Sequence, residues 1–204
     1  MINCTGDLTR TFSTLGASNH SKKERPHEDY YATPPIAVEK LLEVEKFNHY
    51  IWEPACGEGH ISEVLKKHGY DVISTDLIDR GYSEYEPFDF LKCDETDLRE
   101  DIVTNPPYKY ALEFVDKALN SINNGHKVAM LLRIQFLETK KRCEFFKENP
   151  PRKVWVFADR IACAPNGNFD EIYDSKTNRF KSAVCNAWFV WEKGYKGPTE
   201  IGWL

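Results

Sequence analysis

Four consecutive residues, Asn105-Pro106-Pro107-Tyr108, combine groups that could hold a weakly nucleophilic amine in place. Each proline fixes φ and lacks an N–H, so the pair makes a rigid turn that directs the Pro106 carbonyl. The Asn105 side chain offers a second carbonyl, and two acceptors against the N–H groups of an amine support positive charge developing on its nitrogen. Tyr108 adds a ring on which a flat base could stack. A strand-ending turn with a surface tyrosine is the simpler interpretation, but the position after a predicted strand and downstream of a glycine turn argues against it.

That glycine turn, EPACGEG at 53–59, is a second candidate site. Gly57 and Gly59 carry no side chains, so backbone N–H groups there can approach a ligand closely. The spacing differs from GxGxxG, and Glu53 at the end of the preceding strand would repel a pyrophosphate. A ligand with an ammonium group and ribose hydroxyls fits better, because Asp76 ends the next strand, where acidic side chains reach ribose hydroxyls in doubly wound folds. Taken alone, each glycine is equally well explained by a plain turn.

Predicted strands and helices alternate along the chain, which indicates a parallel sheet with helices on both faces. The expected strands are 50–52, 70–75, 88–91, 101–104, 127–134, 153–158 and 183–191. The expected helices are 33–45, with Thr33 as its N-cap, and 61–69, 110–122 and 137–149. No helix separates the last two strands, so they should form an antiparallel hairpin joined by a long polar loop, 158–182. Residues 30–204 are expected to form one domain and residues 1–29 a flexible arm.

Together, EPACGEG, NPPY and the segment DYYATP resemble the motifs of S-adenosylmethionine-dependent amino-methyltransferases. The match is nearest to the DNA adenine-N6 methyltransferases of the small phage and prophage type, and it extends from about residue 29 to residue 191. The order of the motifs is similar to that of the gamma class. The resemblance implies a Rossmann-like class I methyltransferase fold, with a mostly parallel seven-stranded sheet and a C-terminal antiparallel hairpin.

The resemblance also implies roles for individual residues. Residues Glu53, Pro54, Ala55, Cys56, Gly57 and Gly59 would cradle the methionine part of S-adenosylmethionine, Asp76 its ribose, and Leu77, Asp89 and Phe90 its adenine; Tyr31 and Thr33 would contact its carboxylate. Tyr30 could replace Tyr31, and Phe90 could instead be a core aromatic. Asn105, Pro106, Pro107 and Tyr108 would be the catalytic residues, transferring methyl to the N6 amine of an adenine flipped out of DNA.

Several alternatives stay open. The same fold could act on an adenine in RNA or on a glutamine side chain of a protein, since the glutamine-methylating enzymes of release factors share NPPY. A non-catalytic module that only recognises nucleic acid is a further alternative, although it would need neither Asn105 nor Tyr108. A dinucleotide-dependent oxidoreductase is weaker still, because the turn lacks the third spaced glycine.

The chain leaves no room for a separate DNA-recognition domain, so the loop 158–182 and the arm 1–29 are the candidates for reading the target. Within the loop, Arg160, Lys176, Arg179 and Lys181 could contact phosphates, and Asn166, Asn168 and Asn178 could read base edges. The net charge is −5, yet residues 127–204 hold 14 Lys and Arg against 9 Asp and Glu. A basic C-terminal third can present a local positive face to phosphates. The triplet 140–142, Lys-Lys-Arg, is more simply a solvated helix face.

Other features narrow the class of protein. The six cysteines are scattered without a CxxC pair, which argues against a zinc site and suits reduced thiols in the cytoplasm. The resemblance to phage and prophage enzymes implies that this is the cytoplasm of a bacterial or phage-infected cell. No run of about 18 apolar residues predicts a membrane helix. A homodimer or a partner subunit, and a cognate endonuclease of a restriction-modification system, stay open.

Overall fold

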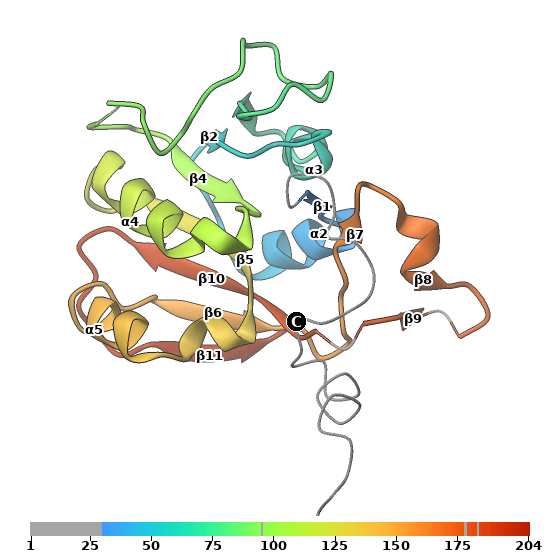
Figure 1. Ribbon diagram of the computed structural model, residues 1–204. Helices are drawn as coiled ribbons and strands as arrows, with labels where there is room; N and C mark the ends of the chain where they lie inside the picture. Colours follow the sequence, from blue (N-terminus) through green and yellow to red (C-terminus); the bar gives the residue numbers. More distant parts are fainter. Residues whose placement is uncertain (1–29, 95, 178, 183) are drawn as a thin grey trace, which may run out of the picture.

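A computed structural model describes residues 30–94, 96–177, 179–182 and 184–204, and the expected arm 1–29 lies outside them. The described chain forms a central seven-stranded sheet with helices on both faces and two small two-stranded sheets at its side (Figure 1). This is the α/β architecture that the alternation of strands and helices predicted.

The central sheet is parallel over one half and mixed over the other. Its parallel half runs β3 (Asp71–Ser74), β2 (Tyr50–Glu53), β4 (Asp101–Thr104) and β5 (Lys127–Arg133). Next come β10 (Asn186–Glu192), β6 (Lys153–Val156) and β11 (Glu200–Trp203). Strand β10 is antiparallel to both β5 and β6, while β11 adds to β6 in parallel. The predicted antiparallel pairing of the last two strands is therefore confirmed.

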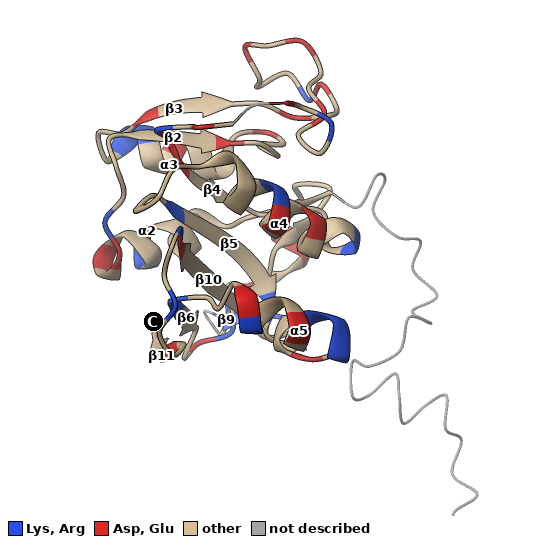
Figure 2. Ribbon diagram, turned by 90° about the vertical axis from the view of Figure 1, so that its left-hand side faces the viewer, with Lys and Arg blue, Asp and Glu red and all other residues tan. Residues whose placement is uncertain are grey.

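The sheet separates two hydrophobic clusters. Along β5, Val128, Met130 and Leu132 belong to one cluster, and Ala129 and Leu131 to the other, as expected when successive side chains point to opposite faces. The first cluster is covered by α4 (Ala111–Ser121) and α5 (Lys140–Glu148), and the second by α2 (Pro35–Val44) and α3 (His60–Lys67). Figure 2 shows acidic and basic residues together on the outer surfaces of α4 and α5. Burial on both faces explains the near-continuous apolar sequence of β5.

Segment 88–91 is not a strand, contrary to the sequence-based prediction. The Asp89 side chain accepts a hydrogen bond from the Leu91 amide at 3.1 Å, and its carbonyl accepts one from the Lys92 amide at 3.0 Å. Aspartate favours such local bonds over strand pairing, and here they close the chain into a turn. Strand β11, which the sequence did not predict, is the seventh strand instead.

The start of α2 also differs from the prediction. Its N-cap is Pro34, whose carbonyl accepts the Ala37 amide at 2.9 Å, and Pro35 is the first helical residue. Thr33 lies one residue too early to cap the helix, so its hydroxyl is available for another partner.

The connection 158–182 is more ordered than a polar loop. Strand β7 (Ala164–Pro165) pairs with β1 (Tyr31–Ala32) in an antiparallel sheet. A short 3₁₀ helix, η4 (Phe169–Glu171), is followed by β8 (Tyr173–Asp174) and β9 (Arg179–Phe180), which pair with each other. The connection therefore fastens the segment before α2 to the body of the domain.

A buried carboxylate ties the amino ends of the parallel strands together. Asp101, at the start of β4, is 1% exposed. It accepts hydrogen bonds from the Asn48 amide at 2.7 Å, from Asn48 Nδ2 at 3.0 Å and from the Lys127 amide at 2.9 Å. Charged acceptors make the stronger class of hydrogen bond, so this group fixes the entries to β2, β4 and β5.

Replacing this carboxylate should destabilise the fold. Asp101→Ala leaves buried amide donors unsatisfied and should lower the free energy of unfolding by about 3 kcal/mol. Urea titration followed by circular dichroism measures the change. Asp94→Ala, an exposed aspartate before the same strand, should change it by less than about 0.5 kcal/mol. Equal effects of the two substitutions would contradict the role given to Asp101.

Candidate active site

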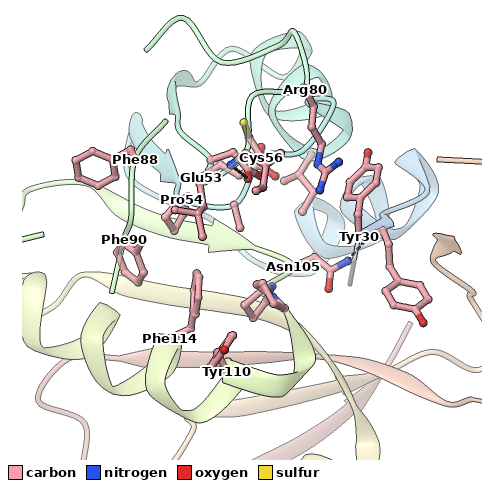
Figure 3. A pocket seen from close by; sticks show the side chains of 18 of the residues that line it. Tyr30, Glu53, Pro54, Cys56, Arg80, Phe88, Phe90, Asn105, Tyr110 and Phe114 are labelled. Atoms are coloured by element: carbon pink, nitrogen blue, oxygen red, sulfur yellow. Dashed lines mark hydrogen bonds between the residues drawn. The ribbon is translucent and has the colours of Figure 1, made fainter. Parts of the chain in front are cut away.

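A cavity of about 660 Å³ opens at the carboxyl ends of β2, β3 and β4, the edge where doubly wound sheets bind ligands (Figure 3). Fourteen of the residues selected from the sequence line it: Tyr31, Thr33, Glu53, Pro54, Ala55, Cys56, Asp76, Leu77, Asp89, Phe90, Asn105, Pro106, Pro107 and Tyr108. The fold therefore brings the glycine turn and the Asn-Pro-Pro-Tyr segment to one site, although 45 residues separate Gly59 from Asn105.

The Asn105 amide is held by the segment before α2. Its Nδ2 donates hydrogen bonds to the Tyr31 carbonyl at 2.9 Å and to Thr33 Oγ1 at 3.0 Å. Both N–H groups are thereby used, and the side chain cannot rotate without breaking them. No described residue donates a hydrogen bond to Asn105 Oδ1, so this oxygen remains an acceptor on a cavity-lining side chain.

The prolines that follow give this segment its shape. Pro106 is buried, and Pro107 (φ −53°, ψ 120°) precedes a short 3₁₀ helix, η2 (Tyr108–Tyr110). The fixed φ of each proline keeps the Pro106 carbonyl in one direction relative to Asn105.

The Tyr108 ring is enclosed by three neighbours. The Arg133 guanidinium lies 4.7 Å from the ring centroid, and the Tyr31 ring lies 5.7 Å away at a tilt of 41°. The hydroxyl donates to Cys163 Sγ at 3.7 Å. Burial raises the pKa of Tyr108 well above its usual value, so the hydroxyl stays protonated at neutral pH. One ring face is thus already in contact with a cation, which the sequence did not predict.

Glu53 is held beneath the glycine turn. It is 1% exposed, and its Oε2 accepts hydrogen bonds from the Ser62 amide at 2.9 Å and from the Ser62 hydroxyl. The Ser62 hydroxyl also contacts Ser74 Oγ at 2.7 Å. Burial raises the pKa of Glu53 well above its usual value, although the Ser62 donors oppose the shift. Burial likewise raises the pKa of the Cys56 thiol, to about 12, so that thiol is not a nucleophile at neutral pH.

The two glycines are required for packing as well as for the turn. Gly57 and Gly59 have φ of +55° and +81°, in the left-handed region that favours glycine. A Cβ on Gly57 would lie 2.4 Å from the Tyr30 ring, and one on Gly59 would lie 2.3 Å from the Tyr82 ring. Neither glycine lines the cavity, so the tight turn and these two rings, rather than direct approach of a ligand, account for both residues in this structure.

Asp76 braces the turn from the neighbouring strand. Its carboxylate accepts hydrogen bonds from the Gly57 amide at 2.7 Å and from the Ile78 amide at 2.9 Å. Leu77 beside it is 56% exposed and lines the cavity. An acidic group and an apolar surface therefore lie next to each other at the mouth of the cavity.

The far wall combines an ion pair with aromatic rings. Asp89 pairs with Lys92 at 2.9 Å. Phe90 is 2% exposed, with the rings of Trp52 and Phe114 at 5.2 and 5.1 Å. Phe90 thus belongs to the hydrophobic cluster, as the alternative interpretation held, and it also lines the cavity.

The six loop residues expected to meet nucleic acid do not line the cavity, and Asn178 lies outside the described residues. The Asn166 amide donates to the Tyr30 carbonyl at 3.1 Å, and Asn168 Nδ2 donates to Glu171 at 3.1 Å. Arg160 donates to the Ser182 carbonyl at 3.1 Å. Lys176, Arg179 and Lys181 lie in and around the β8–β9 hairpin.

The loop packs against residues of the site, although none of its described residues lines the cavity. Phe169 packs edge-on against His60 with ring centroids 5.2 Å apart, and a Cβ on Gly167 would lie 2.6 Å from Glu58 Oε2. Cys163 lies 3.7 Å from Asn105 Nδ2. The loop is therefore joined both to the glycine turn and to the Asn105 segment.

Sequence reasoning missed several of these neighbours. Arg133 ends an apolar strand at the carboxyl edge of the sheet, and that position could have identified it. Arg80 lies 4.4 Å over the Tyr30 ring, and Tyr82 donates to Glu63 at 2.5 Å; both belong to the connection after β3, which has no recognisable pattern. No sequence pattern marks Cys163, because its contacts with Asn105 and Tyr108 form only when the 158–182 loop packs against the site.

The described part of the chain contains no group of three or more His, Cys, Asp or Glu side chains placed to hold a metal ion. Among those same residues, no helix is both long and apolar enough to cross a membrane.

Comparisons with known proteins give matches among solved structures alone: no protein family model and no curated protein matches the chain. A Listeria monocytogenes protein described as a class I S-adenosylmethionine-dependent methyltransferase is 15% identical, with a TM-score of 0.56, over 96% of this chain and 71% of its own. The type I restriction-modification methyltransferase subunit of Streptococcus thermophilus is 11% identical, with a TM-score of 0.58, over 85% of this chain and 46% of its own. A Pyrococcus horikoshii protein described as an RNA methyltransferase is 13% identical, with a TM-score of 0.55, over 91% and 98%.

The fold is that of the class I S-adenosylmethionine-dependent methyltransferases, as the motifs implied. The chain spans less than half the length of the Streptococcus thermophilus subunit and of a Vibrio vulnificus modification subunit of a type I restriction enzyme, to which it is also similar.

The buried Glu53 carboxyl gives a prediction about stability that is independent of function. Its folded pKa is raised, so between its unfolded value, about 4.3, and the raised value the folded state binds more protons than the unfolded state. The contribution of Glu53 to stability is therefore lost as pH rises, by up to about 1.4 kcal/mol per pH unit.

Glu53→Gln removes this titration. The difference in free energy of unfolding, variant minus wild type, should become more positive between pH 5 and pH 8, as measured by urea titration at each pH. Glu43→Gln, at an exposed glutamate of α2, serves as the control and should leave the difference constant. A pH-independent difference for Glu53→Gln would show that its carboxyl ionises normally.

Proposed function

We propose that the protein transfers a methyl group from S-adenosylmethionine to the N6 amine of an adenine extruded from DNA. The observation that carries the proposal is the anchored Asn105 amide, whose Nδ2 is bound by Tyr31 and Thr33 and whose Oδ1 is left as an acceptor at the cavity. An enzyme that binds an amine through both of its N–H groups needs an acceptor of fixed orientation, and this contact supplies one.

The residues that line the cavity fit S-adenosylmethionine. The volume of the cavity, about 660 Å³, is in the range of cofactor sites. The carboxyl groups of Asp76 and Asp89 suit ribose hydroxyls and an exocyclic amine, and Leu77 and Phe90 offer apolar surface to an adenine ring. Glu53, which lines the cavity beside the glycine turn, would contact the methionine part, as the resemblance implies. When bound, S-adenosylmethionine supplies an electrophilic methyl group on a sulfonium.

The chain's own residues would prepare the acceptor. The adenine N6 lone pair is delocalised into the ring, so the amine is a poor nucleophile. Asn105 Oδ1 and the Pro106 carbonyl would accept its two N–H groups and favour a tetrahedral nitrogen. As the N–CH₃ bond forms, the S–CH₃ bond breaks, and the extra proton on N6 leaves to solvent. The two fixed carbonyls stabilise the positive charge that develops before that proton is lost.

Asn at the first motif position resembles adenine enzymes more than cytosine-N4 enzymes. DNA is preferred as substrate because the matched structures include subunits of type I restriction systems. An adenine in RNA is the second candidate, supported by the match to a protein described as an RNA methyltransferase. A protein glutamine would also suit the Asn105 and Pro106 acceptors.

Transfer of labelled methyl from S-adenosylmethionine tests the proposal. Unmethylated duplex DNA, structured RNA and a protein extract are offered in parallel to the wild type and to Asn105→Ala. We expect label in DNA, recovered as N6-methyladenine, with a loss of at least about 100-fold in Asn105→Ala. Label in RNA or protein alone would overturn the substrate, and no label in any of them, with cofactor bound, would overturn the activity.

The contact between Asn105 and Thr33 gives a sharper prediction. Thr33→Val keeps the shape of the side chain but removes the acceptor for Asn105 Nδ2, so kcat should fall by about 10-fold. Cofactor affinity, measured by calorimetry, should change by less than about twofold. Thr33→Ser restores the hydroxyl and should recover most of kcat. A loss of cofactor affinity with unchanged kcat would instead favour the role in carboxylate binding that the resemblance implied.

A further inference from the structure

Two cationic side chains flank Tyr108 without a carboxylate partner among the described residues. Arg133, the exposed last residue of β5, contacts the face of the Tyr108 ring. Lys109 follows Tyr108 in the chain, lines the cavity and is exposed, with its Nζ 5.0 Å from the Tyr110 ring centroid. Figure 3 shows Tyr110 on the same side of the cavity as Asn105. Both cations therefore lie beside the residues that would receive the acceptor base.

Three other cations around the site have polar partners. Lys92 pairs with Asp89 at 2.9 Å, Arg142 donates to the Gln135 carbonyl at 3.0 Å, and Arg160 donates to the Ser182 carbonyl at 3.1 Å. Arg133 and Lys109 instead rest on aromatic rings. A guanidinium that stacks on a ring keeps its in-plane N–H groups, which match the paired oxygens of a phosphate.

The start of α5 extends the positive surface beyond Arg133. A short 3₁₀ helix, η3 (Ile134–Leu137), leads from β5 to α5, whose first residues are Lys140 and Lys141, with no acidic residue in the first turn. Positive charges at a helix N-terminus oppose the helix dipole, so helix stability does not account for them. Lys141 reaches Glu113 of α4 at 3.7 Å, with both side chains at least half exposed, which places α5's start close to α4.

We propose that Arg133 and Lys109 bind the phosphates on either side of the nucleotide whose base enters the cavity. The inference rests on the proposed function and deepens it: the acceptor is a strand of DNA, recognised by its charge at the rim of the site, and not the side chain of a protein. In this arrangement the edge of the sheet beside Tyr108 supplies contacts to the DNA phosphates, in addition to any contacts from the 158–182 loop. Arg133 would connect the base-binding and phosphate-binding parts of the site. The face of its guanidinium contacts the Tyr108 ring, and its edge would bind a phosphate.

The salt dependence of DNA binding tests this assignment. Labelled duplex DNA is titrated with protein and S-adenosylhomocysteine between 50 and 200 mM salt. Each lost phosphate contact should reduce the slope of log K against log salt by about 1. We therefore expect a reduction of about 1 for Arg133→Gln and about 2 for Arg133→Gln combined with Lys109→Gln.

Arg99→Gln provides the matched control. Arg99 is exposed and precedes β4, so it lies at the opposite edge of the sheet, and its loss removes the same charge. It should leave the salt slope and the transfer kinetics unchanged. Arg133→Lys keeps the charge but not the paired donors, so it should keep the slope and lose part of the affinity.

Steady-state methyl transfer separates phosphate binding from support of Tyr108. Arg133→Gln should raise KM for DNA by about 10-fold and leave kcat at saturating DNA within about threefold. A fall in kcat without a change in KM or salt slope would assign Arg133 to Tyr108 alone and overturn the inference. The inference would also be overturned if Arg133→Gln, alone and combined with Lys109→Gln, gave the same salt slope as Arg99→Gln.

The wild-type protein distinguishes this failure from failure of the proposed function. Wild-type transfer to DNA with unaltered slopes in the variants overturns only the inference. Transfer to RNA with reduced slopes supports the phosphate contacts and overturns DNA as the substrate. Transfer to protein alone, without binding of nucleic acid, overturns both.

Discussion

The site depends on the two hydrogen bonds that Asn105 donates to Tyr31 and Thr33. They join the end of β4 to the segment before α2, more than 70 residues away in the sequence. That segment is in turn held by β7, through the β1–β7 pairing. Asn105 is therefore oriented by two parts of the chain that have no sequence relation to it. Fixing a polar group before a reaction avoids the energy of reorganising it during the reaction.

The other half of the site follows the same principle. Asp76 holds the Gly57 amide, and Ser62 holds the Glu53 carboxyl, so the glycine turn is braced from the neighbouring strand and from α3 before any ligand binds. Tyr30 and Tyr82 cover the two glycines, which leaves no space for a side chain at either position. Burying Glu53 carries a desolvation penalty, and a protein keeps such a group where its chemistry is needed.

Local sequence signals predicted the elements that local physics controls. The apolar run 127–134 favoured a strand, and the glycines of 53–59 favoured a turn. Asn105 and its prolines followed a predicted strand, so their position at the carboxyl edge of the sheet could be inferred. The 88–91 segment was wrongly taken as a strand because the side chain of Asp89 closes a turn that hydrophobicity does not reveal.

The remaining differences depend on contacts between distant residues. Strand β11 is four residues long and is defined by pairing with β6, which no local pattern indicates. Thr33 looked like a helix cap from its type and position, but its partner is Asn105. Arg133 and Cys163 reach Tyr108 only after β5 and the 158–182 connection are in place.

A crystal structure of the protein with S-adenosylhomocysteine tests the central claim most directly. The account predicts that the ligand lies between the 53–59 turn, which Asp76 braces, and the wall formed by Asp89 and Phe90, with its sulfur facing Asn105 and the Asn105–Thr33 hydrogen bond intact. A ligand bound elsewhere, or an Asn105 amide turned so that Nδ2 faces the sulfur, would contradict it.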